Sequence, residues 1–190
     1  MSGGARHLAL TATLVTSLLA SRAAVAATLE GPITSPGSAF LVATTFDPAE
    51  VGYVQEEYFL SGTASSYTSA GGAFTSDGAW TAARGETADY KTRLVVYRPT
   101  NPRKFNGTVV VEWLNVTGGL DVPALWMPTH RHLIRNGCTW VGVSAQLVGI
   151  EGGGVMPGLG LHQLEPGRYA ELHHPGDAYA YDMFSQIGRF

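Results

Sequence analysis

The segment VVVEWLNVTGG, residues 109–119, and the residues on either side of it allow the fold to be predicted. Three successive valines are typical of a strand that is buried on both faces of a sheet, although Glu112 interrupts the apolar run. The segment ends in a polar turn with two glycines, directly before an amphipathic stretch. A buried strand that leads through a flexible turn into a helix predicts the first half of a βαβ unit.

The residues that follow complete this unit. Apolar side chains recur at helical spacing from about residue 122 to residue 135, and Asn136 and Gly137 supply a helix stop signal. Residues 138–145, CTWVGVSA, favour a second buried strand. The two strands should be parallel and joined by a right-handed crossover. The sequence therefore predicts an α/β fold.

Two earlier segments also favour strands. Residues 51–61 are rich in aromatic and branched side chains and predict an edge strand, which its cluster of polar residues at 55–57 would protect from unwanted pairing. Residues 90–98 predict another strand. The residues between them, 62–88, are rich in Gly, Ser and Thr and predict a long irregular connection. A short link through Asn106 and Gly107 suggests that these early strands and the 109–114 strand are antiparallel neighbours.

After the βαβ unit, a Gly-rich loop is expected at residues 148–160 and a second helix at 177–189, with Asp177 in its first turn. A helix in this position normally leads into another parallel strand, but the sequence ends at Phe190. We therefore expect residues 27–190 to be the N-terminal part of a domain that is incomplete in this sequence.

The first 26 residues resemble a secretory signal peptide. Arg6 and His7 precede an Ala/Leu-rich stretch, and Ala24-Val25-Ala26 supplies the small residues of a cleavage site. The apolar stretch is short for a membrane span, and no later segment reaches the roughly 20 residues that a span needs. The expectation is an exported protein, periplasmic or secreted, with no membrane partner once the signal is removed.

Composition excludes several classes of function. The chain of 190 residues has 12 basic and 15 acidic side chains and no dense basic run, which argues against a nucleic-acid partner. Cys138 is the only cysteine, so there is no disulfide framework and no thiolate metal cluster. His130 and His132 are two residues apart on an expected helix, and His173 and His174 precede another, so neither pair has the spacing of a zinc site. We expect no metal and no cofactor.

Ligands in open α/β sheets gather at the carboxyl ends of the parallel strands. Two such ends are expected here, at Asn115–Gly119 and at Gln146–Gly149. The glycines of the first turn would expose backbone N–H groups, which can hold a developing oxyanion; a plain strand-to-helix loop would have the same sequence features. No nucleophile is apparent, because Ser144 lies inside a buried strand and no G-x-S-x-G motif occurs.

Several long motifs resemble a poorly characterised branch of the α/β-hydrolase-domain proteins. They are EEYFLSGTA (56–64), DYKTR (89–93), VVVEWLNVTGGLD (109–121), WVGVSAQLVGIEG (140–152) and HPGDAYAYDMFSQIGR (174–189). The resemblance runs from about Gly31 to the last residue. It implies an eight-stranded, mostly parallel sheet and a serine hydrolase that acts on small-molecule esters or related acyl compounds.

The resemblance also implies where the functional groups lie. The nucleophile elbow would follow a strand that begins just after Phe190, and the acid and the histidine would come later still, so no catalytic triad residue is expected within 1–190. The turn after the 109–114 strand is placed like the oxyanion loop of these hydrolases. Its backbone N–H groups, those of Val116, Thr117 and Gly118, are the candidate oxyanion donors. The candidate pocket-lining residues are Asn115, Gly119 and Gln146.

Two alternatives remain open at this point. The chain could be a binding or interaction domain that keeps a hydrolase scaffold without catalysis. It could also be a secreted carbohydrate-binding module with its four tryptophans, Trp80, Trp113, Trp126 and Trp140, as stacking platforms. Three of the four lie in expected strands or a helix beside apolar neighbours, which favours core packing for them. Glu112 has no evident role in the sequence, and a buried or edge-facing donor such as Arg93 is the suggested partner.

Overall fold

The computed structural model describes residues 27–34, 36–72 and 75–190. The predicted signal peptide, residues 1–26, lies outside the described residues. The strands and helices are β1 (Thr28–Glu30), η1 (Pro48–Val51), β2 (Tyr53–Ser69), β3 (Ala82–Pro99), η2 (Pro102–Lys104), β4 (Val109–Trp113), α1 (Trp126–Arg135), β5 (Thr139–Val143), α2 (Leu147–Glu151), α3 (Leu161–Leu164), α4 (Pro166–Tyr169), η3 (Asp177–Tyr179) and α5 (Ala180–Ile187). None of the helices in these ranges is long and apolar enough to cross a membrane.

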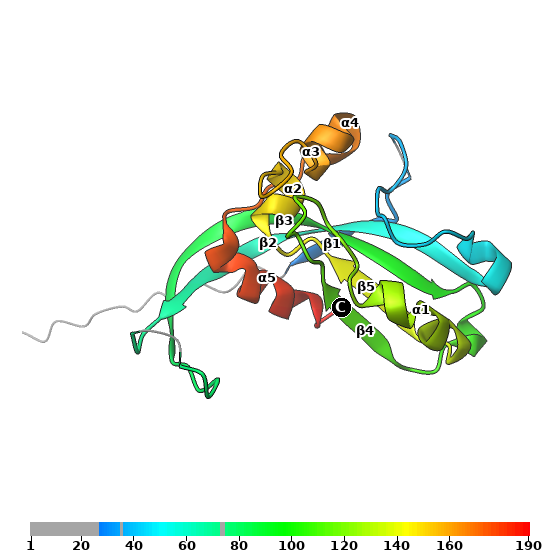
Figure 1. Cartoon of the computed structure of the whole chain (residues 1–190), viewed down its shortest axis with the longest axis horizontal. Coiled ribbons are helices and arrows are strands. Elements are labelled where there is room, and N and C mark those ends of the chain that lie inside the picture. The colour runs from blue at the N-terminus through cyan, green and yellow to red at the C-terminus, as the bar shows by residue number, and fades with distance from the viewer. Residues whose placement is uncertain (1–26, 35, 73–74) are drawn as a thin grey trace, which may run out of the picture.

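The strands form one mixed sheet in the order β1-β2-β3-β5-β4 (Figure 1). β4 and β5 are parallel and in register from Val109 opposite Thr139 to Trp113 opposite Val143, so the predicted βαβ unit is confirmed. All other pairs are antiparallel. The fold is thus α/β, with early antiparallel strands that precede a parallel crossover.

Two details of the predicted sheet are wrong. β4 follows β3 in the sequence but does not pair with it, because β5 lies between them and pairs with both. β5 suits this interior position, since Trp140 and Val143 are fully buried, whereas Val109 of β4 is about half exposed. Residues 51–61, which were expected to form an edge strand, lie largely in β2. This strand is not at an edge, because it has β1 on one side and β3 on the other.

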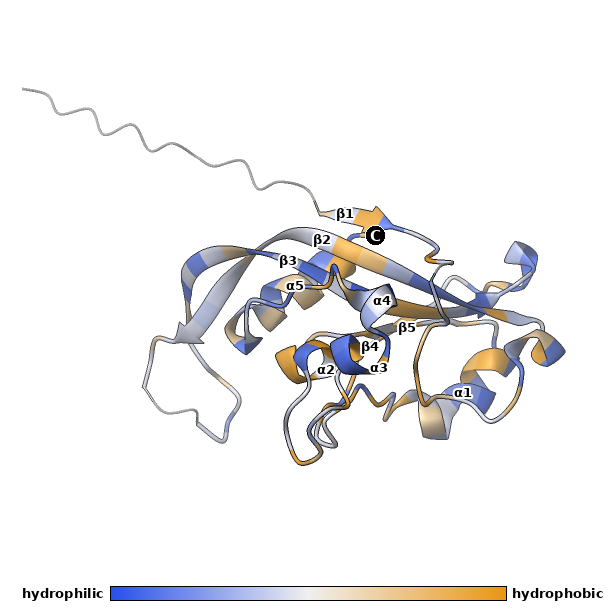
Figure 2. Ribbon diagram, turned by 90° about the horizontal axis from the view of Figure 1, so that it is seen from above, coloured by the Kyte–Doolittle hydropathy of each residue, from blue (hydrophilic) through white to orange (hydrophobic). Residues whose placement is uncertain are grey.

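The region 62–88 is not an irregular connection. β2 and β3 continue through most of it as a long hairpin, with one register shift between Ser65 and Tyr67, and only residues 70–81 connect the strands. Figure 2 shows why the sequence pattern missed this part, because its orange apolar residues lie in the middle of β2 and the far end of the hairpin is pale or blue. These strands have no apolar alternation. They are held by cross-strand backbone pairing and by the hydrogen bond from the Ser65 N–H to Asp182 of α5.

Alternating side chains of the strands face two separate cores. On one face, Val95, Tyr97 and Trp140 pack against α1 through Trp126 and Leu133. The opposite face packs against α5 through Met183 and Ile187 and contributes Leu60, Leu94 and Val143. Helices therefore cover both faces of the sheet, as expected for an α/β protein.

The helices are shorter than the sequence pattern predicted. α1 begins at Trp126 rather than at residue 122, because Val122 pairs with Asn115 through two backbone hydrogen bonds of 3.0 and 2.8 Å. The predicted helix 177–189 is a 3-10 turn followed by α5. The expected loop 148–160 begins inside the short helix α2.

Glu112 does not pair with Arg93, so this suggestion is wrong. Its carboxylate accepts hydrogen bonds from the backbone N–H groups of Leu125 (2.6 Å) and Trp126 (2.9 Å) and from the indole N–H of Trp140 (2.9 Å). The N-cap residue of α1, Leu125, has no capping side chain of its own. Glu112 thus caps α1 from β4 and places its negative charge at the positive end of the helix dipole.

Candidate functional site

The candidate site is the loop between β4 and α1. Leu114 donates its backbone N–H to Val143 of β5 (3.1 Å), which fixes the start of the loop to the sheet. The paired backbone of Asn115 and Val122 then closes its two ends against each other. Residues 115–122 therefore form a short closed loop at the carboxyl end of β4, beside the carboxyl end of β5.

The three candidate oxyanion donors of this loop differ in their hydrogen bonds. The N–H of Thr117 donates to Oδ1 of its neighbour Asn115 at 3.1 Å, in an Asx turn. Among the described residues, the N–H groups of Val116 and Gly118 donate to no protein acceptor. Gly118 is half-buried and Val116 is buried. Two of the three N–H groups are thus available to a ligand.

Gly119 joins this loop to the segment 153–156. Its φ of +90° lies in the left-handed region, and a Cβ atom there would come within 2.3 Å of the carbonyl oxygen of Met156 and 2.7 Å of that of Gly153. No residue with a side chain fits this position. Glycine at 119 thus places a second loop, which includes the exposed Val155 and Met156, against the candidate site.

Gln146 lies directly after β5 and is half-buried. Its Oε1 accepts a hydrogen bond from the indole N–H of Trp113 at 3.0 Å, so its side chain is held across the ends of β4 and β5. The backbone N–H of the next residue, Leu147, donates to Oδ1 of Asp177 at 2.8 Å. The structure therefore brings the predicted residues 115–119 and Gln146 to adjacent strand ends.

Asp121 anchors the far end of the loop in the protein interior. One carboxylate oxygen, Oδ2, accepts hydrogen bonds from the Ser144 hydroxyl (2.5 Å) and from Nη2 of Arg93 (2.7 Å). Burial raises the pKa of this carboxyl, and the Arg93 guanidinium and the Ser144 hydroxyl oppose that shift. A Cβ at residue 149 would lie 2.3 Å from the other oxygen, so Gly149 is required beside it.

Two buried arginines continue this hydrogen-bond network into the N-terminal segment, residues 33–34 and 36–40. Arg93 also donates to the carbonyl of Phe40 and, through Nε, to the Ser144 hydroxyl. Arg168 donates to Glu57 at 2.5 Å and to the backbone carbonyls of residues 33, 36 and 37. Glu57 also accepts from the hydroxyl of Tyr169 (2.8 Å). The candidate loop is thus supported by a connected set of buried charges.

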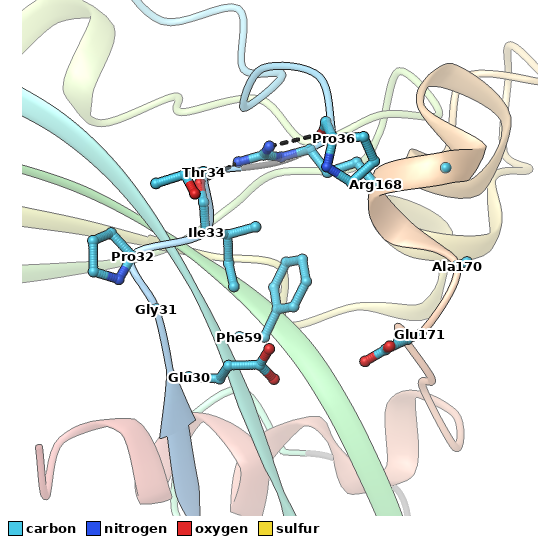
Figure 3. A pocket seen from close by; sticks show the side chains of 11 residues that line it. Glu30, Gly31, Pro32, Ile33, Thr34, Pro36, Phe59, Arg168, Ala170 and Glu171 are labelled. Carbon is cyan, nitrogen blue, oxygen red and sulfur yellow. Dashed lines mark hydrogen bonds between the residues drawn. The ribbon is translucent and has the colours of Figure 1, made fainter.

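A cleft of about 440 Å³ lies between β1 and α4 and is lined in part by residues 30–34 and 36 (Figure 3). Phe59 forms its floor, with Glu30 and Glu171 beside it and Arg168 above. Lys91 lies 2.8 Å from Glu30 and 2.6 Å from Glu171 and so neutralises the acidic side. An adjoining cleft of about 580 Å³ shares residues 32–34 and Arg168. Since the Arg168 guanidinium already donates to four acceptors, these clefts are best explained as part of the scaffold.

Ser144 is not placed as a nucleophile. Its side chain is fully buried and its hydroxyl is engaged with Asp121 and Arg93. His174 lies next to this cluster, but its Nε2 is 3.0 Å from the carbonyl of Ala145, and its Nδ1 accepts the N–H of Gly176 at 3.1 Å. Within the ranges 27–34, 36–72 and 75–190, no serine hydroxyl forms a hydrogen bond with a histidine ring.

His174 gives the stability of the chain a predicted pH dependence. Burial lowers the pKa of its imidazole, and His173 adds to this shift, while the Ala145 carbonyl, Asp177 and Glu151 oppose it. A lowered pKa in the folded state favours the neutral ring, so this stability is present above pH 6.5 and is lost as the pH falls towards the folded-state pKa. Urea unfolding between pH 8 and pH 5 measures it.

The variant His174→Gln is expected to flatten this pH dependence, because it removes the titrating group. His173→Gln changes an exposed neighbour and is the matched control. An equal flattening in both variants, or in neither, would contradict the assignment to His174.

Metal ligands are not gathered in the described part of the chain, where no group of three or more His, Cys, Asp or Glu side chains could hold an ion. His130 directs Nδ1 at the carbonyl of Met127 (2.9 Å), and His132 is exposed on α1. Sequence reasoning missed the supporting residues Asp121, Arg93 and Arg168. The sequence signal for Arg93 was a charge beside the apolar run at residues 94–96, whereas Asp121 and Arg168 lie in loop-like or polar stretches that gave no such signal.

Comparison with known protein families gives a match over most of the chain. The model of a family described as alpha/beta hydrolase domain matches residues 29–190, which is most of the chain. No curated protein and no solved structure matches the chain.

Proposed function

Because the chain belongs to the alpha/beta hydrolase domain family, we propose that it takes part in the hydrolysis of a carboxylic ester or a related acyl compound. The proposal assigns the loop 115–119 to the oxyanion. In acyl transfer, the attack of a nucleophile on the carbonyl carbon moves an electron pair onto the carbonyl oxygen. Backbone N–H groups fixed near that oxygen stabilise the charge, and each is typically worth about 3–4 kcal/mol.

The observation that carries this proposal is the pair of available N–H groups in a loop whose ends are fixed. The N–H groups of Val116 and Gly118 have no protein acceptor in the described part of the chain. Both ends of the loop are held, by β5 at Leu114 and by the buried Arg93 at Asp121. Donors that do not have to reorganise are what electrostatic stabilisation requires.

The nucleophile is proposed to lie outside this sequence. Among the described residues no serine hydroxyl is hydrogen-bonded to a histidine ring, and the resemblance of the chain to α/β-hydrolase-domain proteins implies a nucleophile elbow after residue 190. The role proposed for this chain is thus to orient the acyl group and to donate to the oxyanion. We include export in the proposal; a secreted or periplasmic product that begins near Ala27 would support it.

The first test compares two forms of the protein with p-nitrophenyl butyrate as substrate. The chain 1–190 is expected to show no turnover that a serine-directed fluorophosphonate blocks. The product of the coding sequence read beyond Phe190 is expected to hydrolyse the ester and to be labelled by the same reagent. Fluorophosphonate-sensitive turnover by the 190-residue chain would overturn the proposed position of the nucleophile.

The second test removes one N–H group from the active form. Gly118→Pro lacks this donor and is expected to lower kcat by about 10²- to 10³-fold. Gly118→Ala is the matched control: it keeps the N–H, and its Cβ would meet Leu120 and Met156 only at 3.5 and 3.6 Å, which are ordinary contacts. Both variants are checked for an unchanged unfolding transition. Equal kcat values in two folded variants would rule out Gly118 as a donor.

A further inference from the structure

A separate cleft of about 430 Å³ lies between the far end of the β2–β3 hairpin and α5. Figure 1 shows α5 close to this part of the hairpin. The volume is within the range of about 300–1,000 Å³ that is common for small-ligand sites. The cleft is lined by Tyr67, Thr68, Ser69, Gly78, Trp80, Thr81, Ala82, Tyr181, Asp182 and Ser185.

Aromatic rings supply the apolar surface of this cleft. Trp80 and Tyr181 have exposed fractions of 56% and 64%, which is high for side chains of this size, and Tyr67 adds a third ring. The lining has no Leu, Ile, Val or Met, and alanine is its largest aliphatic side chain. An acyl chain would therefore meet few of the aliphatic contacts that it prefers. A flat, partly polar ligand fits this lining better.

Polar groups surround the rings. Four hydroxyl side chains and the carboxylate of Asp182 line the cleft, and no Lys, Arg or His does. The Ser69 and Ser185 hydroxyls already donate to backbone carbonyls, each at 2.7 Å. Those of Thr68 and Thr81 form no side-chain hydrogen bond with other described residues. A cleft lined by a carboxylate and by no basic side chain disfavours an anionic ligand, because the two negative charges would repel each other. The ligand is therefore neutral or cationic, with several hydroxyl or amine groups.

Several contacts fix the cleft in place. Oδ2 of Asp182 accepts the backbone N–H of Ser65 at 2.6 Å and so ties α5 to β2. The Trp80 indole N–H donates to the carbonyl of Thr75 at 2.8 Å, which sets the orientation of the ring. Tyr181 packs against Trp113 of β4 with ring centroids 5.5 Å apart. Rings that are already ordered lose little side-chain entropy when a ligand binds.

We propose that this cleft binds a neutral sugar residue of an oligosaccharide. The C–H face of a pyranose ring stacks on Trp80 and Tyr181, and its hydroxyl groups donate to Asp182 and exchange hydrogen bonds with Thr68 and Thr81. This assignment uses all three features of the lining: aromatic rings, hydroxyls and an acceptor without a positive partner in the cleft. It does not depend on the proposed ester hydrolysis, because none of its residues belongs to the loop 115–119.

A quaternary ammonium ion is the competing ligand, since aromatic rings beside a carboxylate also attract cations. The hydroxyl groups favour the sugar, because such a cation has no group that could hydrogen-bond with them. The test therefore includes both chemistries, together with an acyl chain.

The experiment is isothermal titration calorimetry of the full chain with cellotetraose and maltotetraose, and separately with tetramethylammonium and octanoate. Saturable binding of a tetrasaccharide is expected. Trp80→Ala and Tyr181→Ala should each raise its Kd about tenfold or more. Phe105→Ala is the matched control, because Phe105 is an exposed aromatic residue (40%) away from the cleft, and it should leave Kd unchanged.

Since both cleft residues are largely exposed, the variants should keep the wild-type unfolding midpoint, and this is measured alongside. Three results would overturn the proposal. The first is that neither tetrasaccharide shows saturable binding. The second is that the wild type and folded Trp80→Ala bind the tetrasaccharide with equal Kd. The third is that only tetramethylammonium or octanoate binds and that Trp80→Ala abolishes this binding.

Discussion

Arg93→Met is expected to lower the free energy of unfolding by about 3–5 kcal/mol. Arg93 is completely buried, and its guanidinium is hydrogen-bonded to Asp121, Ser144 and the Phe40 carbonyl. Methionine fills a similar volume but leaves the Asp121 carboxylate buried without its cation. The penalty comes from that unpaired charge more than from lost packing. Urea unfolding at pH 7 gives the measurement.

The matched control for this prediction is two residues earlier on the same strand. Lys91 also pairs with two carboxylates, but those of Glu30 and Glu171 are 57% and 75% exposed. The Lys91 side chain is itself only 17% exposed, but its removal leaves no buried charge because both carboxylates stay in contact with water, so Lys91→Met should cost no more than about 1 kcal/mol. The double variant Arg93→Met with Asp121→Leu removes both charges and should recover part of the loss. A single variant as stable as the wild type would refute the structural role of this pair.

Glu112→Leu is expected to cost about 3–5 kcal/mol, because it leaves two buried donors and one part-buried donor without an acceptor. These are the N–H groups of Leu125 and Trp126 and the indole N–H of Trp140. Leucine also removes the cap of α1 and the negative charge at its N-terminus. The loss thus affects β4, α1 and β5 together. Thermal unfolding followed by near-ultraviolet circular dichroism, to which the buried Trp126 and Trp140 contribute, should report it.

Two further variants separate these contributions. Glu112→Gln keeps one acceptor oxygen and the same shape, so a smaller loss of about 1–3 kcal/mol is expected. Glu86→Leu removes an exposed carboxylate from β3 and should stay within about 0.5 kcal/mol of the wild type. If Glu112→Leu were no more destabilising than Glu86→Leu, the capping role of Glu112 would be wrong.

The parts of the fold that sequence predicted are those with local signals. The valines of 109–111, the helical spacing that ends at Arg135 and the apolar residues of 139–143 each specify their own element, and the parallel pairing follows from their order. The far half of the hairpin has no apolar alternation, so nothing in residues 62–88 identified it. Its pairing is specified by register with a partner strand and not by its own pattern.

The candidate loop shows the same division. Its position after a buried strand and its glycines were evident from the sequence, and the asparagine two residues before Thr117 is a local Asx-turn signal. The partners of Asp121 and Arg93 could not be predicted, because they are 23 to 53 residues apart in the chain. For Glu112, the sequence indicated a need for a donor, but any of several buried donors would have met it.

In residues 33–34 and 36–40, the hydrogen bonds that the two buried arginines make go to main-chain carbonyls. Arg93 donates to the carbonyl of residue 40, and Arg168 donates to those of residues 33, 36 and 37, where no side chain of the segment is involved. The course of residues 33–34 and 36–40 therefore depends on side chains far away in the sequence, at positions 93 and 168 and at Tyr169, whose hydroxyl accepts the Phe40 N–H. Substitutions within the segment can accumulate over evolution without loss of these contacts, whereas either arginine can change only together with its acidic partners.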